Sequence, residues 1–220
     1  MLIAYVCCED DVARKRTESR RTAIIAAAAE AFLEFGYDKT SMSLIAERLG
    51  GSKATLYSYF KSKEELLLAV LDNEIDTNAA AILGTAMGEP DTRKALSIVG
   101  TGYLMQRLSV RPTRYFRMVS GQSGESDIGQ HFWNNILKPA WMLMCTKMRE
   151  YMDEGRLRHA DPWMASMHFK GLLEADLVER RLLGDIRGPE ADLVTDRVRN
   201  AVDVFLHFYG PQKAPRPDGN

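Results

Sequence analysis

Apolar residues recur along most of the chain at intervals of three and four, the spacing of one face of an α-helix. No convincing run alternates β-branched with polar residues, as a strand would require. Pro139 is expected to kink one long helix, because proline lacks the backbone N–H that helix interiors use. Breaks at Gly and Pro place the later helices near 91–109, 113–120, 127–154, 162–183 and 189–208. The pattern therefore predicts an all-α fold.

The first helix of the chain is predicted from an apolar stripe that ends at Gly36. Glycine readily adopts the left-handed conformation of a carboxyl-terminal helix cap, so the helix should stop there. Charged residues such as Arg20 and Glu34 fall mostly away from the stripe. The stripe, which we expect to be buried, consists of Ile24, Ala27, Ala28, Ala31, Phe32 and Phe35.

Two short helices follow, joined by a turn at Gly50 and Gly51. Serine side chains can accept hydrogen bonds from the free N–H groups at helix starts, and suitable caps precede each helix. These caps are Ser41 and Ser52, and Ser62 can cap a fourth helix. The apolar face of the first short helix contains Leu44, Ile45 and Leu49. This arrangement is typical of a helix-turn-helix, whose second helix enters the major groove of DNA, about 12 Å wide.

The second short helix, 53–60, has one anchoring face and one polar face. Leu56 and Phe60 lie four residues apart and should pack on the domain, and Tyr59 is also expected to face the core. The other side presents small polar groups and a cation, which suits contact with base edges and phosphates. Its residues are Lys53, Ala54, Thr55 and Ser58.

The charges are partitioned along the chain in a way that supports this interpretation. The 220 residues have a formal net charge of -1, which by itself argues against a nucleic-acid partner. However, residues 12–63 hold ten basic and five acidic groups, a net +5, and the remainder carries about -6. A basic module joined to an acidic body is typical of a protein that binds a polyanion.

The composition places the chain among ordinary globular proteins, with 45% hydrophobic and 27% charged residues. Three cysteines without metal-ligand spacing suit a reducing, cytoplasmic location, and acidic neighbours disfavour a reactive thiolate at Cys7 and Cys8. The apolar run at 1–6 lacks the features of a signal peptide or membrane span, so no membrane association is expected. We expect a flexible arm over 1–13 and a disordered tail over 210–220.

Motifs of catalysis and metal binding are not found, so we expect neither an enzyme nor a bound cofactor. The chain has no glycine-rich phosphate loop, no His-Glu-x-x-His and no Glu-x-x-His pair. Ser58 and Lys61 spell a Ser-x-x-Lys motif, but its companion motifs are missing. The histidines, which show no ligand-like grouping, are His131, His159, His168 and His207.

Residues 40–66, TSMSLIAERLGGSKATLYSYFKSKEEL, resemble the DNA-binding domain of TetR-family transcriptional regulators. Residues 31–37, AFLEFGY, are similar to the end of that family's first helix. The resemblance covers roughly 17–66. It implies a homodimeric regulator, usually a repressor, that a small-molecule effector releases from a palindromic operator on double-stranded DNA. A helix-turn-helix domain would then occupy 14–62 and a ligand-binding and dimerisation domain 63–209.

The resemblance also implies roles for individual residues. Lys53, Thr55 and Ser43 would read bases or the groove edge. Tyr57, Lys63 and Ser41 would contact phosphates, although Lys63 could be merely solvated and Ser41 could serve only as a cap. The full predicted DNA-binding set is Ser41, Ser43, Lys53, Ala54, Thr55, Tyr57, Ser58 and Lys63.

Gly51 departs from the family pattern, which usually has an apolar residue such as Val after the turn glycine. Loss of a buried side chain of that size costs roughly 1.5–3 kcal/mol, and a second glycine loosens the turn. Leu49 could partly refill the space. We therefore expect a softer helix-turn-helix. Gly51 also favours an alternative function, a metabolite-binding or catalytic helical bundle with a weakened DNA-binding head.

The carboxyl-terminal part resembles a common ligand-binding domain of the family at 115–119, 151–157 and 169–177. Methionine-rich and aromatic walls adapt to apolar ligands, although residues at helical spacing can equally form the core. His168 could be a polar handle or a structural histidine. The predicted ligand-binding residues are Met105, Tyr115, Phe116, Met118, Trp133, Trp141, Met144 and His168.

The last two predicted helices, 162–183 and 189–208, supply the dimer surface that the resemblance implies. They would pair with their copies in a four-helix interface. The apolar pattern alone does not separate this surface from the core of the monomer. The predicted interface residues are Trp163, Met167, Leu177, Val198, Val202 and Phe205.

Overall fold

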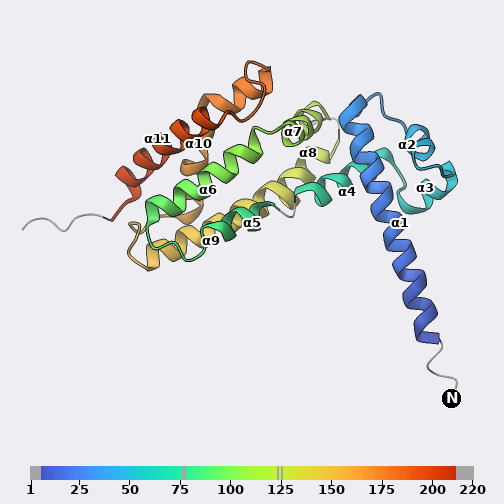
Figure 1. Ribbon diagram of the computed structural model, residues 1–220, viewed down its shortest axis with the longest axis horizontal. Coiled ribbons are helices and arrows are strands. Elements are labelled where there is room, and N and C mark those ends of the chain that lie inside the picture. The colour runs from blue at the N-terminus through green and yellow to red at the C-terminus, as the bar shows by residue number, and fades with distance from the viewer. Residues whose placement is uncertain (1–5, 76–77, 123, 125, 212–220) are drawn as a thin grey trace, which may run out of the picture. The chain divides into compact units, whose positions relative to one another are not determined.

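The computed structural model describes residues 6–211 except 76, 77, 123 and 125, and every regular element within them is helical (Figure 1). The all-α prediction is thus confirmed. The predicted tail lies outside the described residues beyond 211. A flexible arm was predicted over 1–13, but the chain is helical from Val6, where α1 (Val6–Phe35) begins. The side chains of Cys7 and Cys8 lie outside the described part of the chain.

Contacts divide the chain into two units. The head comprises Met1–Ile75 and Met118–Phe132, and the body comprises Asp76–Arg117 and Trp133–Asn220. The boundary falls later than the expected one at residue 62, because α4 (Lys63–Ile75) packs on α1. A segment from the middle of the chain, 118–132, also belongs to the head.

The head contains α1, α2 (Met42–Arg48), α3 (Lys53–Tyr59), α4, the end of α7 (Val110–Gln122) and α8 (Ile128–His131). Most of the predicted stripe of α1 is buried, whereas Ala27 is only partly buried and Phe35 is 38% exposed. The ring of Phe35 is instead covered by the Arg48 guanidinium, 5.0 Å from its centroid. The largest side chains of the head core are Ile24, Phe32, Ile45, Leu56, Phe60, Leu66, Leu67 and Leu71.

The body contains α5 (Asn78–Thr85), α6 (Thr92–Arg107), the start of α7, η1 (Phe132–Leu137) from its second residue onward, α9 (Lys138–Asp153), α10 (Pro162–Leu183) and α11 (Ala191–Tyr209). The break predicted at 110–112 lies earlier, because Pro112 is accommodated in the first turn of α7, where its missing N–H is not needed. The single helix predicted over 127–154 is interrupted by η1, a π-helical segment. It lies just before Pro139, which cannot donate to a preceding carbonyl.

Four of the predicted dimer-interface residues form part of the core of their own chain. Leu177, Val198, Val202 and Phe205 retain 0–3% of their exposure within a single copy. Because their apolar surface is already buried between α6, α10 and α11, they have little left to offer a partner. The assignment of these four residues to a dimer surface is therefore corrected. Trp163 and Met167 are partly buried against the same core.

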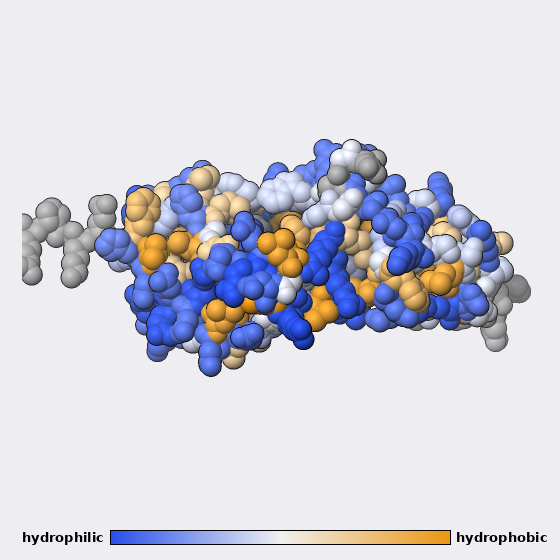
Figure 2. All heavy atoms as spheres, turned by 90° about the horizontal axis from the view of Figure 1, so that it is seen from above, coloured by the Kyte–Doolittle hydropathy of each residue, from blue (hydrophilic) through white to orange (hydrophobic). Residues whose placement is uncertain are grey.

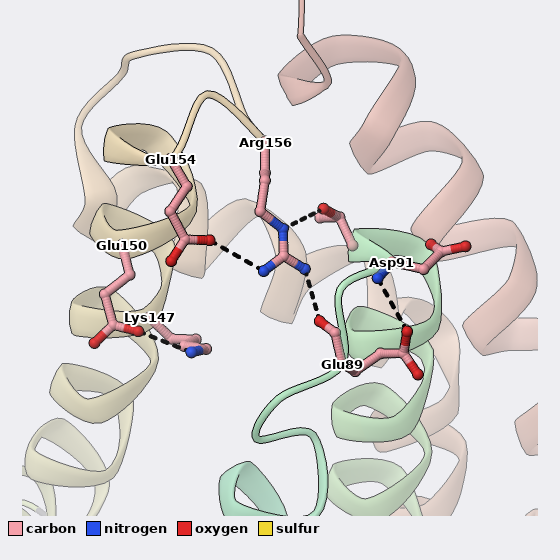
Figure 3. Close-up of polar contacts among 7 residues, drawn as sticks. Glu89, Asp91, Lys147, Glu150, Glu154 and Arg156 are labelled. Carbon is pink, nitrogen blue, oxygen red and sulfur yellow. Dashed lines mark hydrogen bonds and ion pairs between the residues drawn. The ribbon is translucent and has the colours of Figure 1, made fainter.

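Arg156 ties together two loops of the body (Figure 3). Its guanidinium lies 4.1 Å from the centroid of the Tyr151 ring. It donates to the Thr92 hydroxyl and to the carbonyl oxygen of Glu89, both at 3.0 Å, and pairs with Glu154 at 3.1 Å. The turn after α9 is thereby fixed against the segment that leads into α6.

Close packing of three body helices depends on Gly100 in α6. A Cβ atom at this position would lie 3.0 Å from Leu173 Cδ2 and 3.3 Å from Val198 Cγ1, in α10 and α11. Both neighbours are buried in the core of the body, so they would have to shift to admit the added atom. We predict that Gly100→Ala lowers the free energy of unfolding by about 1–3 kcal/mol, measured by urea denaturation.

Gly84→Ala in α5 is the matched control, because no atom lies within 4 Å of the added Cβ. This control, at an exposed position of α5, should leave the free energy of unfolding unchanged or raise it by up to about 1 kcal/mol, because alanine favours a helix over glycine. A Gly100→Ala variant as stable as the control would contradict the close packing of the three helices.

Candidate nucleic-acid interface

The two short helices of the head are capped as the sequence predicts. The Ser41 hydroxyl accepts from the backbone N–H of Leu44 at 3.2 Å, and the Ser52 hydroxyl accepts from that of Thr55 at 3.1 Å. The turn between them passes through Gly50, whose φ of +59° lies in the left-handed region. The caps and this turn set the point and direction at which α3 begins.

Two buried side chains decide which face of α3 meets solvent. Leu56 and Phe60 are 1% and 2% exposed, as the four-residue spacing predicts, whereas Tyr59 is only partly buried. The Arg21 guanidinium lies 5.3 Å from the centroid of the Phe60 ring and holds this end of α3 against α1. The opposite side of α3 is therefore exposed, and it carries Lys53, Ala54, Thr55, Tyr57 and Ser58.

The hydroxyl groups on this exposed face are held by local hydrogen bonds. Thr55 Oγ1 lies 2.9 Å from the Ser52 hydroxyl, and the Ser58 hydroxyl donates to the Thr55 carbonyl at 2.7 Å. The Lys53 ammonium lies 5.9 Å from the centroid of the Tyr57 ring. Lys53 and Tyr57 thus form a cationic and aromatic pair beside two hydroxyls of fixed position.

Lys63, at the start of α4, is oriented by the neighbouring loop. Its ammonium donates to the Tyr37 carbonyl at 2.8 Å and lies 4.0 Å from the centroid of the Tyr37 ring. Burial raises the pKa of Tyr37, and the carboxylates of Glu64 and Asp38 raise it further. An ammonium has three N–H donors, so Lys63 keeps donors for a phosphate. The start of α2 contributes Ser41 and Ser43, both exposed.

The space beside Gly51 is not the void that the sequence suggested. A Cβ atom added to Gly51 would lie 2.7 Å from Nη2 of Arg20, so the guanidinium occupies this space. The expectation that Leu49 refills it was wrong, because only Arg20 atoms lie within 4 Å of that position. Leu49 is partly exposed instead.

Two polar contacts join the segment 118–132 to the loop before α2 and to α4. Gln122 Nε2 donates to Asp38 Oδ1 at 3.2 Å, next to α2. His131 Nε2 lies 3.2 Å from Asp72 Oδ1, which joins α8 to α4. Movement of this segment would therefore be passed to both α4 and the loop before α2.

The predicted ligand-binding residues do not form one group. Trp141, Met144 and Tyr115 are 9% or less exposed in the body, whereas Met105 and Trp133 are 40% and 41% exposed. Phe116 is partly buried beneath the Arg107 guanidinium, 4.4 Å from its ring centroid, and Met118 belongs to the head. His168 is exposed, and its Nδ1 lies 2.6 Å from the Tyr209 hydroxyl. It is thus partnered within its own chain, as in the structural alternative.

A polar cluster in the body was not predicted. The Glu174 carboxylate accepts from the Tyr103 hydroxyl, pairs with Lys170, and lies 3.5 Å from Arg107 Nε. Trp141 packs edge-on against Tyr103, with 5.1 Å between ring centroids. Burial raises the pKa of Tyr103 well above its usual value, and Glu174 raises it further. Only the four-residue spacing of Lys170 and Glu174 could have suggested this cluster from sequence.

Within the described residues, no group of three or more His, Cys, Asp or Glu side chains could hold a metal ion. None of the described helices is long and apolar enough to cross a membrane.

Two stretches of the chain match known protein families, one near the amino terminus and one in the carboxyl-terminal half. Residues 24–70 match the family described as "Bacterial regulatory proteins, tetR family". Residues 94–211, more than half of the chain, match the family described as "AefR-like transcriptional repressor, C-terminal domain".

Curated relatives match over shorter stretches. The chain is 38% identical over 79 residues to the transcriptional activator FasR of Mycolicibacterium smegmatis, covering 36% of each protein. It is 40% identical over 62 residues to the regulator RutR of Escherichia coli, covering 28% of this chain and 29% of RutR. The chain therefore spans less than half the length of the curated relatives that it matches.

Solved structures share the fold over most of the chain. A TetR-family regulator from Mesorhizobium loti superimposes with a TM-score of 0.81 at 20% identity, covering 89% of this chain and 98% of its own. The flavonoid-responsive regulator FrrA gives 0.72 at 24% identity, covering 89% and 100%. FadR of Bacillus subtilis, solved with stearoyl-CoA, gives 0.67 at 20% identity, covering 84% and 96%.

The raised pKa of Tyr103 predicts a pH dependence of stability. A phenol whose folded-state pKa exceeds its unfolded-state value of about 10 stabilises the fold below that value, and the contribution is lost as pH rises toward the folded-state pKa. Tyr103→Phe should therefore lose less stability than the wild type between about pH 9.5 and 11. Urea denaturation across this range measures the difference. Tyr57→Phe, at an exposed tyrosine, is the control, and equal slopes for wild type and Tyr103→Phe would contradict the prediction.

Proposed function

Because the chain belongs to the TetR family of DNA-binding transcriptional regulators, we propose that it is a homodimeric repressor that a small, largely apolar ligand releases from a palindromic operator. The family consists of regulators and not of enzymes. The observation that carries the proposal is the exposed face of α3, where Lys53, Thr55 and Tyr57 stand opposite the buried anchors Leu56 and Phe60. A groove-reading helix needs this division between anchor and reading face.

A homodimer would present two copies of α3 to successive major grooves, about 34–36 Å apart. The surface that we propose for pairing is the exposed apolar part of α10 and α11. Figure 2 shows apolar side chains among charged ones over the body. On α10 and α11 the large exposed apolar residues are Met164, Leu183, Val204 and Phe208, at 47–87% exposure. These residues replace the buried ones that the sequence suggested. Pairing of two copies would remove this apolar area from water.

The ligand would act on the body. FrrA is described as flavonoid-responsive, FadR of Bacillus subtilis was solved with stearoyl-CoA, and a regulator from Saccharomonospora viridis was solved with choline. In this chain the buried side chains of Trp141 and Met144 are aromatic and flexible, and Tyr103 packs on Trp141, while its hydroxyl and Arg107 both contact Glu174. This combination supports a largely apolar ligand with a polar end.

Release from DNA would proceed through the segment 118–132. Both ends of this segment continue into the body, through α7 and η1, while Gln122 and His131 contact the head. A ligand that binds one arrangement of α7 and η1 better than another shifts the population of that arrangement. The shift would reach α4 through the contact of His131 with Asp72.

We favour repression over activation because the match over 94–211, more than half of the chain, is to a repressor domain. FasR, described as an activator, matches over 36% of the chain. The alternative of a bundle with a weakened DNA-binding head rested on the expected void at Gly51. The Arg20 guanidinium occupies that space, which removes the argument for this alternative.

Lys53 and Lys63 should contribute differently to DNA binding. We predict that Lys53→Ala relaxes preference at one base pair by about 1–3 kcal/mol, because its ammonium can donate to a guanine. Lys63→Ala should weaken specific and random duplexes alike, because a phosphate contact carries no sequence information. Fluorescence anisotropy on duplexes enriched from a random pool by the wild type measures both effects.

Lys94→Ala, at an exposed position of α6, is the matched control for these two variants and should bind like the wild type. Equal losses on specific and random duplexes for both head variants would contradict the assigned roles. Failure of the wild type to enrich any duplex would contradict the proposed function itself.

The pairing surface can be tested by adding a charge to it. Val204→Glu in α11 should shift the protein toward monomer in sedimentation equilibrium, because an unpaired carboxylate would be buried between the copies. Thr195→Glu adds the same charge nine residues away, on the opposite side of the same helix, and should leave the dimer intact. Unchanged association of Val204→Glu would place the dimer surface elsewhere.

A further inference from the structure

Arg20 and Gly51 fit together in a way that neither the DNA-binding residues nor the core explains. Gly51 lies in the turn between α2 and α3, and Arg20 lies on α1. A Cβ atom at residue 51 would be 2.7 Å from Nη2 of Arg20 and 4.0 Å from its Cζ. The first distance is far below van der Waals contact. The guanidinium can therefore lie against this turn only because residue 51 has no side chain.

Among the described residues, no carboxylate pairs with the guanidinium at this turn. The side chain of Arg20 is nevertheless partly buried. Arg48, also in the head, is paired with Glu34. Partial removal of a cation from water costs free energy unless an anion or acceptor compensates. An anion brought by a partner would supply this compensation.

The position of Arg20 beside the start of α3 indicates where such an anion would lie. Ser52, the cap of α3, directly follows Gly51, and the exposed Lys53 follows Ser52. The neighbouring Arg21 lies at the other end of α3, over the Phe60 ring. The two consecutive arginines of α1 thus lie at the two ends of the helix that is proposed to enter the groove. DNA phosphates flank such a helix on both sides.

We infer that Arg20 is a further DNA-binding residue, which contacts a backbone phosphate at the start of α3 and is admitted to this position by Gly51. The inference rests on the proposed function. A planar guanidinium can bind a phosphate through two parallel N–H···O bonds, which an ammonium cannot do. With glycine at residue 51, the head lacks the apolar side chain that is usual in the family at this position. It gains instead a cation on the surface proposed to face DNA.

The first test measures affinity as a function of salt for Arg20→Ala. Each phosphate contact contributes about 0.9 to the slope of log Kobs against log salt. Arg20→Ala should therefore reduce the slope by about one and weaken binding roughly tenfold at low salt. Arg20→Lys should keep the slope, because the charge remains, with a smaller loss of affinity. Fluorescence anisotropy on the enriched duplex gives both quantities.

The second test uses Gly51→Val, which keeps Arg20 but places an apolar group where the guanidinium lies. This variant should lose slope and affinity as Arg20→Ala does, because a side chain at residue 51 displaces the guanidinium from the turn. If the two residues act together, Arg20→Ala in the Gly51→Val background should change affinity less than about twofold. Thermal unfolding of each variant without DNA reports its stability separately.

The outcomes distinguish failure of the inference about Arg20 from failure of the proposed function. A lower melting temperature of Arg20→Ala with an unchanged salt slope would show that Arg20 only fills the space at Gly51, and would overturn the inference. Additive losses in the double variant would also overturn it. Wild-type protein that binds no duplex in a salt-dependent manner would instead overturn the proposed function.

Discussion

Burial of Leu56 and Phe60 is the constraint on which the DNA-binding surface depends. α3 has only seven residues, too few to be stable alone, so tertiary packing must hold it. Full burial of each of these side chains contributes about 1.5–3 kcal/mol, and the Arg21 guanidinium covers the Phe60 ring. With these anchors in place, the rotation of α3 is fixed. Its polar residues therefore face solvent, on the side opposite Leu56 and Phe60.

The features predicted correctly from sequence are those set by residues close together in the chain. The caps Ser41 and Ser52 and the spacing of Leu56 and Phe60 depend on intervals of three or four residues, which helical geometry determines. The end of α1 at Gly36 is equally local, with a φ of +81°.

The features missed depend on residues far apart in the chain. Arg20 fills the space at Gly51 from α1, and Tyr103 reaches Glu174 across 71 residues. The pattern showed that Val198 and Val202 are apolar, but it could not show whether they face their own chain or a second copy. The boundary of the head was misplaced for the same reason, because 118–132 joins it by contacts and not by sequence.

The chain crosses between the head and the body more than once, which suits a regulator whose body must influence its head. The chain passes from head to body after Ile75, returns after Arg117, and leaves again after Phe132. Two of these crossings bound the segment whose Gln122 and His131 contact the head. A change in the body therefore has a covalent route to α4 and to the loop before α2. The near-zero net charge is consistent with this division, because only the basic residues of 12–63 need to meet phosphate.

Footprinting on the DNA that flanks the protein's own gene tests the central claim most directly. The account predicts protection of a palindrome at moderate salt, with the centres of its two half-sites separated by one helical turn or a multiple of it, about 34–36 Å per turn. Protection of both half-sites together would show that two copies of α3 read the operator. Absence of any protected palindrome, or protection without regard to sequence, would contradict the claim that this chain is an operator-binding repressor.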